Sequence, residues 1–181
     1  MNKRAAVLLA DGFEETEAVT VIDVLRRAHV DVTVAGVTGR RVTGSHAIVI
    51  EADTTLVETS GAFDLVVLPG GMPGAAHLRD STIVRAFVTK QYAGGAVAAA
   101  ICAAPIALSH FGLLDGKHAT CFPGFEEQLG KAHLESKPVV VDGSIVTSRG
   151  VGTALAFSLA LVSQLMGPTT AHELEEDMLV S

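Results

Sequence analysis

The stretch VAAAICAAPIAL, residues 97–108, joins a strand-like run to a helical pattern through a single thiol. Its first half is a run of small apolar residues, typical of a strand buried on both faces. Cys102 ends the run, and a helical pattern begins just after it, with Pro105 in the first turn, where a missing N–H costs nothing. The thiol is therefore predicted at a strand-to-helix junction, where N–H groups and the helix dipole would lower its pKa.

Apolar runs alternate with helical patterns along the rest of the chain. Strand-like runs cover residues 4–10, 30–35, 48–52, 64–68, 97–102, 139–141 and 144–148. Helical patterns cover residues 14–27, 81–92, 103–110, 150–166 and 171–179. This alternation predicts an α/β fold with a mostly parallel sheet sandwiched by helices, plus one hairpin that turns at Asp142-Gly143. No repeat or linker interrupts the order, so residues 1–181 are expected to form a single domain.

Bulk composition narrows the functional classes. Of the 181 residues, 49% are hydrophobic and 18% are charged, which excludes a disordered chain. A net charge of −7 without a long basic run argues against nucleic acid as a partner. No apolar stretch suits a membrane span or a secretory signal, and the two cysteines form no CxxC pair. A cytoplasmic protein without a membrane partner is expected.

Small residues flank the thiol on both sides. Ala100 and Ala104 stand two positions before and two positions after Cys102. A nucleophile on a sharp strand-to-helix turn needs small neighbours at these offsets, and Gly-x-Ser-x-Gly elbows meet the same need with glycine. Ordinary packing around a buried cysteine produces the same pattern, so these residues alone leave both readings open.

Four motifs in order extend the pattern over nearly the whole chain. They are ADGFEETE at 10–17, VVLPGG at 66–71, AAICAAP at 99–105 and TSRGVGT at 147–153. Together they resemble the DJ-1/PfpI (ThiJ) superfamily, and most of all its DJ-1 and YajL branch, from residue 3 to residue 165. The resemblance implies a flavodoxin-like, doubly wound α/β sandwich with a cysteine nucleophile elbow, usually assembled as a homodimer.

The resemblance also implies roles for individual residues. Cys102 takes the place of the catalytic cysteine, and Glu17 that of a protonated glutamate that donates a hydrogen bond to the sulfur. Such a carboxyl, near an anionic sulfur in a partly buried cleft, should have a raised pKa. Gly71 and the N–H of Ala103 resemble an oxyanion hole. The alternatives are a solvated Glu17 early in a helix and a plain turn at residues 69–71.

Further residues are assigned to the pocket, with one departure from the family pattern. Arg27 and Phe122 align with family positions, His110 is a candidate substitute for the family histidine, Cys121 is a candidate resolving thiol, and Val151 is a candidate lining residue. The alternatives are a surface helix end for Arg27, an ordinary surface or packed His110 and a small buried Cys121. Several family members have a histidine where this chain has Phe122, so a Cys-Glu pair is expected rather than a triad. Proteases of the PfpI type have a histidine directly after the cysteine, and Ala103 occupies that position, which argues against proteolysis.

The implied activity is that of a cofactor-independent glyoxalase or deglycase acting on small dicarbonyls such as methylglyoxal and glyoxal. Without the histidine, turnover is expected to be slow. The alternative is a redox-sensing or chaperone-like protein whose Cys102 oxidises to a sulfinate. The sequence lacks metal-ligand spacing such as His-x-x-x-His, and Leu155 interrupts the dinucleotide-like run at 150–153, so neither a metal nor NAD is expected.

Overall fold

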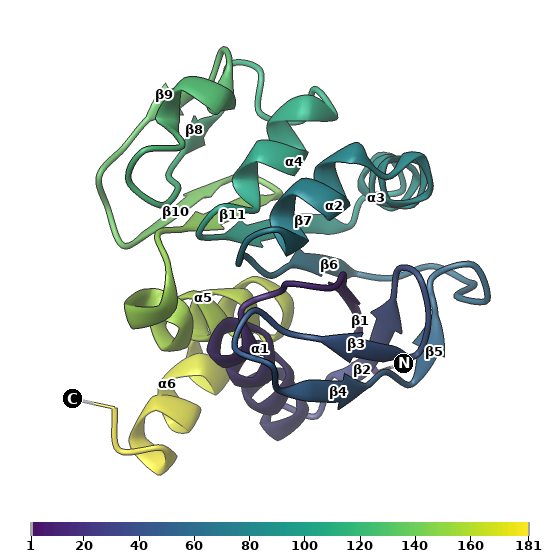
Figure 1. The fold of residues 1–181 in the computed structure, drawn as a ribbon. Coiled ribbons are helices and arrows are strands. Elements are labelled where there is room, and N and C mark those ends of the chain that lie inside the picture. Colours follow the sequence, from purple (N-terminus) through teal and green to yellow (C-terminus); the bar gives the residue numbers. More distant parts are fainter. Residues whose placement is uncertain (1, 181) are drawn as a thin grey trace.

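A computed structural model describes residues 2–180, and a seven-stranded sheet forms its centre (Figure 1). The strands lie in the order β10-β11-β7-β6-β1-β2-β5. Their bounds are Val139–Asp142 for β10, Ile145–Ser148 for β11, Val97–Ile101 for β7, Leu65–Leu68 for β6, Arg4–Leu9 for β1, Asp31–Gly36 for β2 and Thr54–Thr55 for β5. Only the β10–β11 pair is antiparallel among these described strands, which confirms the predicted mostly parallel sheet.

Helices cover both faces of this sheet (Figure 1). One face carries α1 (Glu15–Arg27), α5 (Ala154–Met166) and α6 (Pro168–Asp177), whereas the other carries α2 (Gly74–Asp80), α3 (Thr82–Ala93) and α4 (Pro105–His110). Side chains of β1 alternate between the two cores, with Val7 and Leu9 in one and Leu8 in the other. Because both faces are covered, every residue from Ala5 to Leu9 is apolar and buried.

Local sequence signals explain where the helices begin. Glu14 is the N-cap of α1, where its side chain accepts the Glu17 N–H at 2.7 Å. The helix therefore starts one residue later than the predicted residue 14. Ser81 caps α3 as predicted, and Pro105 occupies the first turn of α4.

Several short elements lie outside the predicted pattern. The run at 48–52 forms β4 (Val49–Glu51), which pairs with β3 (Arg41–Thr43) in a separate ribbon, because its side chains are half exposed rather than buried on both faces. The final hairpin pairs Asp142 with Ile145, so its two-residue loop is Gly143-Ser144 rather than Asp142-Gly143. Helix α2 and the pair β8 (His118–Ala119) and β9 (His133–Leu134) had no sequence signal.

The end of the chain also differs in detail from the prediction. The pattern at 150–166 divides into the 3₁₀ turns η2 (Val151–Thr153) and α5, while η1 (Glu126–Leu129) follows β8. Helix α6 begins at Pro168 rather than at 171, because Gly167 ends α5 and proline suits a first helical position. Among residues 2–180, no helix combines the length and the apolar character needed to cross a bilayer.

The strand order places a crevice at one edge of the sheet. After β1 the chain adds β2 on one side and later β6 on the other, so the connections diverge between β1 and β6. Loops that follow the carboxyl ends of β1, β6, β7 and β11 all lie at this edge. The segments that contain Glu17, Gly71 and Cys102 follow three of these strands.

Candidate active site

Cys102 occupies a sharp elbow between β7 and α4. Its φ of 63° lies in the left-handed region, which is uncommon for a residue other than glycine. The backbone is fixed on both sides, because the Cys102 N–H donates to Ser148 C=O at 3.0 Å and its C=O accepts the Phe122 N–H at 2.8 Å. Ala100 and Ala104 are fully buried. The predicted small neighbours therefore let this turn pack without a clash.

Two backbone N–H groups are directed at the sulfur. They belong to Gly71, after β6, and to Ala103, which follows the thiol, and both lower the pKa of Cys102. Gly71 has a φ of 86°, a conformation that glycine adopts without strain. Helix α4 has only six residues, so its dipole is short, and the hydrogen bonds from Gly71 and Ala103 are the contributions that lower the pKa of the thiol.

Glu17 lies beside the thiol and has no solvent exposure. Its Oε2 accepts the Gly70 N–H at 2.8 Å, and its carboxyl shares a hydrogen bond with the Cys102 thiol. Within residues 2–180, the buried Oε1 has no hydrogen-bond partner. A β-carbon on Gly70 would press against Cys102 Cβ and lie 2.7 Å from Glu17 Oε2, so only glycine lets the three groups meet. The solvated alternative for Glu17 is therefore excluded.

Burial controls how this pair titrates. Burial raises the pKa of Glu17 to about 7, against the hydrogen bonds from Gly70 and Cys102, and the charge of Glu14 adds to the rise. The pKa of Cys102 is raised to about 12 by burial, by the charge of ionised Glu17 and by the hydrogen bond between the thiol and that carboxylate. The lowered thiol pKa predicted from the sequence is therefore wrong while Glu17 is charged, because the N–H donors are outweighed.

The two groups consequently act as a unit. The pair loses its first proton near pH 7, and the remaining proton is shared between a carboxyl oxygen and the sulfur. When that proton lies on Glu17, the carboxyl becomes a donor and the sulfur carries the charge. The arrangement thus places a nucleophile and an acid/base on one hydrogen bond.

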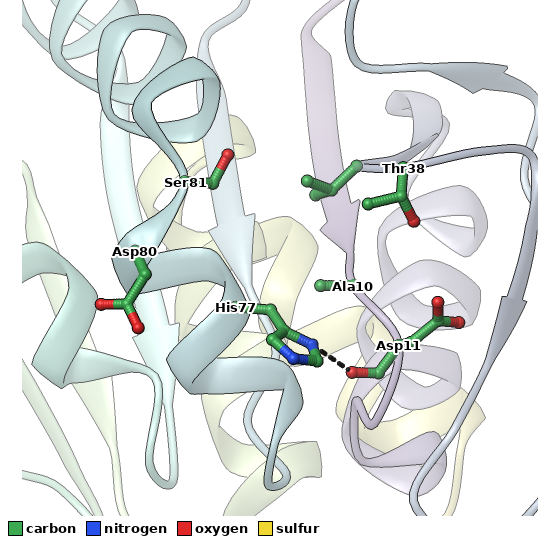
Figure 2. A pocket seen from close by; sticks show the side chains of 7 residues that line it. Ala10, Asp11, Thr38, His77, Asp80 and Ser81 are labelled. Atoms are coloured by element: carbon green, nitrogen blue, oxygen red, sulfur yellow. Dashed lines mark hydrogen bonds between the residues drawn. The ribbon is translucent and has the colours of Figure 1, made fainter.

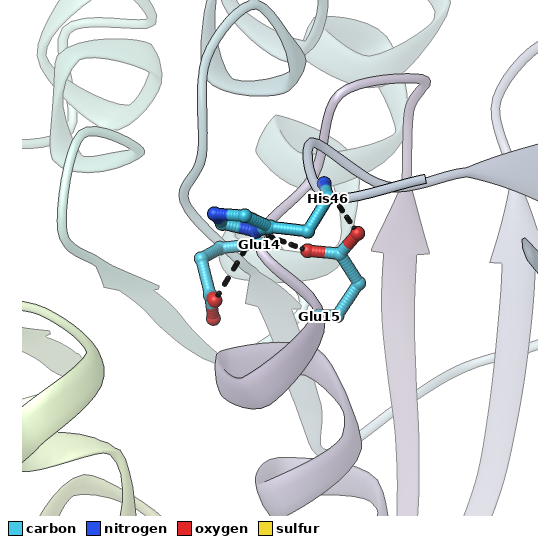
Figure 3. Close-up of side chains that lie close together, drawn as sticks. All are labelled: Glu14, Glu15 and His46. Carbon is cyan, nitrogen blue, oxygen red and sulfur yellow. Dashed lines mark hydrogen bonds and ion pairs between the residues drawn. The ribbon is translucent and has the colours of Figure 1, made fainter. Parts of the chain in front are cut away.

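A second carboxyl cluster stands at the start of α1 (Figure 3). Glu15 accepts the backbone N–H of His46 at 2.6 Å and interacts with its Nδ1 at 2.9 Å. Burial raises the pKa of Glu15, but these hydrogen bonds outweigh it and bring the pKa to about 2. With Glu14, these residues place one ligand atom each within 4.8 Å, close enough for a cation. The Glu15 carboxylate already accepts hydrogen bonds from the backbone of this loop, so the cluster links α1 to residues 44–48.

The other predicted pocket residues are distributed unevenly around the thiol. Phe122 and Val151 are both 46% exposed and follow β8 and β11, in the loops that contact the elbow. Cys121 is buried, and burial raises its pKa to about 11. His110 ends α4, beside a cavity lined by Ser109 and Gln128. Arg27 lies at the opposite end of α1 from Glu17 and pairs with Asp23 at 2.7 Å, so it lies away from the sulfur.

Some contributors to the site carried no sequence prediction. Gly70 lies in the quoted VVLPGG motif, but its N–H bond to Glu17 depends on two segments 53 positions apart. Glu14 accepts the Glu17 N–H from the N-cap position, whereas the sequence pattern predicted it as the first residue of the helix. Ser148 acts through its backbone carbonyl, which no side-chain pattern reveals.

A cavity of about 340 Å³ lies beside the loop after β1 (Figure 2), and Cys102 is not among its lining residues. It is lined by Ala10, Asp11, Val37, Thr38, His77, Asp80 and Ser81. His77 Nδ1 donates to Asp11 C=O at 2.9 Å and so links α2 to the loop after β1. This cavity opens on the α2 side, whereas Cys102 packs against the α1 side of the sheet.

Comparisons with known proteins agree with this geometry. Protein dj-1beta of Drosophila melanogaster is 42% identical over 100% of this chain and 99% of that protein, and its crystal structure superposes with a TM-score of 0.96 over the whole of both chains. Glutathione-independent glyoxalase DJR-1.2 of Caenorhabditis elegans is 30% identical over 96% of this chain and 94% of that protein.

A structure of oxidised Toxoplasma gondii DJ-1 has a TM-score of 0.92 and 36% identity, over 98% of each chain. The model of the DJ-1/PfpI family matches residues 3–164. The flavodoxin-like α/β architecture predicted from the sequence is thus confirmed, and the chain belongs to the DJ-1/PfpI family.

Proposed function

We propose that this protein is a cofactor-independent glyoxalase of the deglycase type, which converts small dicarbonyls such as methylglyoxal and glyoxal to 2-hydroxy acids. One observation carries the proposal: a fully buried carboxyl with a pKa of about 7 is hydrogen-bonded to a partly exposed thiol. A group with this pKa takes and returns protons efficiently near neutral pH. The C. elegans relative named as a glyoxalase supports the same chemistry.

Addition comes first. The thiol proton moves to the Glu17 carboxylate, and the sulfur attacks the aldehyde carbon of the substrate. A C–S bond forms, and the C=O π pair moves to oxygen. The N–H groups of Gly71 and Ala103, which already contact the sulfur, would be within reach of this alkoxide. The alkoxide then takes the proton back from Glu17 and becomes a hemithioacetal.

An internal oxidation and reduction follows. The Glu17 carboxylate removes the hydrogen on the former aldehyde carbon as a proton, and the electron pair forms a C=C bond while the ketone oxygen takes a proton from water. Glu17 returns its proton to the former ketone carbon as the first carbon becomes a thioester and its hydroxyl loses a proton. Water then breaks the C–S bond and releases the 2-hydroxy acid. One carbon is oxidised and its neighbour reduced, so no cofactor is required.

The test follows methylglyoxal consumption and lactate formation in the purified protein and its variants. Cys102→Ser should abolish both, Glu17→Gln should lower turnover by about 10²–10⁴-fold, and the exposed control Glu58→Gln should leave it unchanged. Unchanged consumption in Cys102→Ser would overturn the proposal. Turnover is expected to be low even in the unaltered protein, because Phe122 replaces a second proton-transfer group.

Redox sensing is a second candidate, favoured by the positive φ and the donor hydrogen bonds that distinguish Cys102 from the buried Cys121. Two equivalents of a peroxide would transfer two oxygen atoms to the sulfur, giving a sulfinate and two molecules of water or alcohol. The relative of known structure from T. gondii is described as oxidised. Mass spectrometry after mild peroxide treatment should find two added oxygens on Cys102 and none on Cys121, and equal modification of both thiols would exclude this function.

A homodimer and a cytoplasmic location complete the proposal. A groove of about 510 Å³ lies between α1 and the start of α5, and it includes Val19 and Val151, which are 50% and 46% exposed. Such an apolar face suits a second copy of the chain, and a free reactive thiol suits a reducing compartment. Sedimentation analysis should give a dimer mass, and Val19→Asp should shift it toward the monomer.

A further inference from the structure

The loop after β8 places an aromatic ring beside the reactive sulfur. The Phe122 N–H donates to Cys102 C=O at 2.8 Å, which ties this loop to the elbow. A β-carbon on Gly150 would lie 3.2 Å from Phe122 Cδ2 and 3.8 Å from Cys102 Sγ. The ring and the sulfur therefore face one another across the bare α-carbon of Gly150.

The ring is held in position although it is exposed. Phe125 packs edge-on against Phe122, with ring centroids 6.4 Å apart and planes at 73°, and its N–H donates to Phe122 C=O at 3.2 Å. Phe122 nevertheless remains 46% exposed. An aromatic face fixed from behind and open in front is preorganised to receive a flat apolar group.

The charges around the sulfur limit what that group can be. Glu17 hydrogen-bonds with the thiol, and Glu14 lies beside Glu17. Both are acidic, so a substrate that carries a carboxylate would be repelled, whereas a neutral substituent would be tolerated. Since the thiol bonds to the aldehyde carbon, the substituent on the adjacent ketone carbon is the part within reach of the ring.

We propose that Phe122 and Gly150 form an aryl subsite, which makes aromatic 2-oxoaldehydes such as arylglyoxals better substrates of Cys102 than methylglyoxal or glyoxal. The proposal rests on the glyoxalase function proposed above and specifies its substrate class. Phe122 acts here as a specificity-determining residue, since its ring has no proton to transfer and contacts only the substituent.

Alkylation of Cys102 tests the subsite without requiring turnover. Phenacyl bromide and bromoacetone carry the same reactive carbon and differ in a phenyl or a methyl group. The ratio of their alkylation rates at Cys102, measured by peptide mass spectrometry and divided by the ratio for N-acetylcysteine, isolates the contribution of the protein. Phe122→Ala should lower this corrected ratio by about fivefold, the size of one aromatic contact, and Phe122→Tyr should preserve it.

Two further variants complete the experiment. Gly150→Ala inserts a methyl group between the ring and the sulfur in a backbone that is extended rather than left-handed, and should lower the corrected ratio as Phe122→Ala does. Val57→Ala removes a side chain that is 72% exposed in a distant turn and should change nothing. Equal corrected ratios in the unaltered protein and Phe122→Ala would overturn the aryl subsite.

Turnover then separates the two proposals. The preference in kcat/KM for phenylglyoxal over methylglyoxal should fall in Phe122→Ala by the same factor as the alkylation ratio. If both aldehydes are consumed but Phe122→Ala leaves the preference unchanged, the aryl subsite is refuted and the glyoxalase proposal stands. If the alkylation preference is present but neither aldehyde is consumed, the glyoxalase proposal is refuted and the aryl subsite stands.

Discussion

The two cysteines of this chain differ in burial and still more in what surrounds them, since Cys102 is partly exposed and Cys121 is buried. Burial raises the pKa of both thiols, to about 12 for Cys102 and about 11 for Cys121. Cys102 has a positive φ, two N–H donors and a buried carboxyl partner, whereas Cys121 has the more distant charges of Glu126 and Arg149. We therefore expect the reactivity of Cys102 to come from the partner that exchanges its proton rather than from exposure of the thiol.

The largest expected effect concerns the backbone beside each thiol. Gly71 and Gly124 both have positive φ, 86° and 96°. A β-carbon on Gly71 would lie 2.6 Å from Phe13 C, whereas one on Gly124 would meet nothing within 4 Å. Gly71→Ala should therefore lower the free energy of unfolding by about 4 kcal/mol, through both strain and overpacking. Gly124→Ala should cost about 1 kcal/mol, through strain alone.

Urea unfolding at neutral pH measures both losses. The control is Gly95→Ala, at a surface turn with a φ of 97° and nothing within 4 Å of the added carbon, which should match Gly124→Ala. Equal losses at Gly71 and Gly124 would mean that the backbone around Cys102 is no more constrained than the backbone around Cys121.

The next effect is the pH dependence of stability. The pKa of Glu17 is about 7 in the folded protein against 4.5 for a free carboxyl, so the folded state binds this proton more tightly. The free energy of unfolding should consequently fall by about 3 kcal/mol as the pH rises from 4.5 to 7, and Glu17→Gln should remove that slope. Glu126→Gln, beside Cys121, should leave the slope intact. Identical slopes in the unaltered protein and Glu17→Gln would refute a buried proton on Glu17.

A third effect, about tenfold in rate, should appear in the alkylation of Cys102 by iodoacetamide. In the unaltered protein the rate should rise in two steps, near pH 7 and near pH 12, because the pair loses two protons. Glu17→Gln should show one step between them, since a single titrating group remains. The pH profile of Cys121 alkylation should be the same in both proteins. A single ordinary step for Cys102 in both proteins would show that the titration of the thiol is not coupled to that of Glu17.

The smallest expected effect is on the stability of the region around Cys121. Thr120 is buried next to Cys121, and its Oγ1 has no hydrogen-bond partner within residues 2–180. Thr120→Val should raise the free energy of unfolding by about 1 kcal/mol, because it removes an unpaired polar group. Thr147→Val is the matched control: its Oγ1 accepts the Thr120 N–H at 2.9 Å, so the same change should destabilise the protein. A loss of stability in Thr120→Val would indicate a partner for its hydroxyl.

Local patterns predicted the elements that are buried on both faces. The apolar runs of β1, β6 and β7 and the periodic residues of α1 and α3 appear where the sequence placed them. The run at 48–52 was harder to interpret, because a half-exposed ribbon strand and a sheet strand share the same residue types. The protonation of Cys102 could not be predicted from its neighbours in the chain, since the sequence signals were N–H donors and the opposing carboxylate comes from α1.

The alternation of strands and helices and the elbow at Cys102 could be predicted from local patterns, because both depend on residues that are close together in the chain. The tertiary structure alone decided the pKa of about 7 at Glu17, the contact of Gly71 with the sulfur and the position of the Phe122 ring. These depend on burial and on contacts between segments far apart in the chain. Desolvation acts on a charge only after the whole fold has removed water from around it.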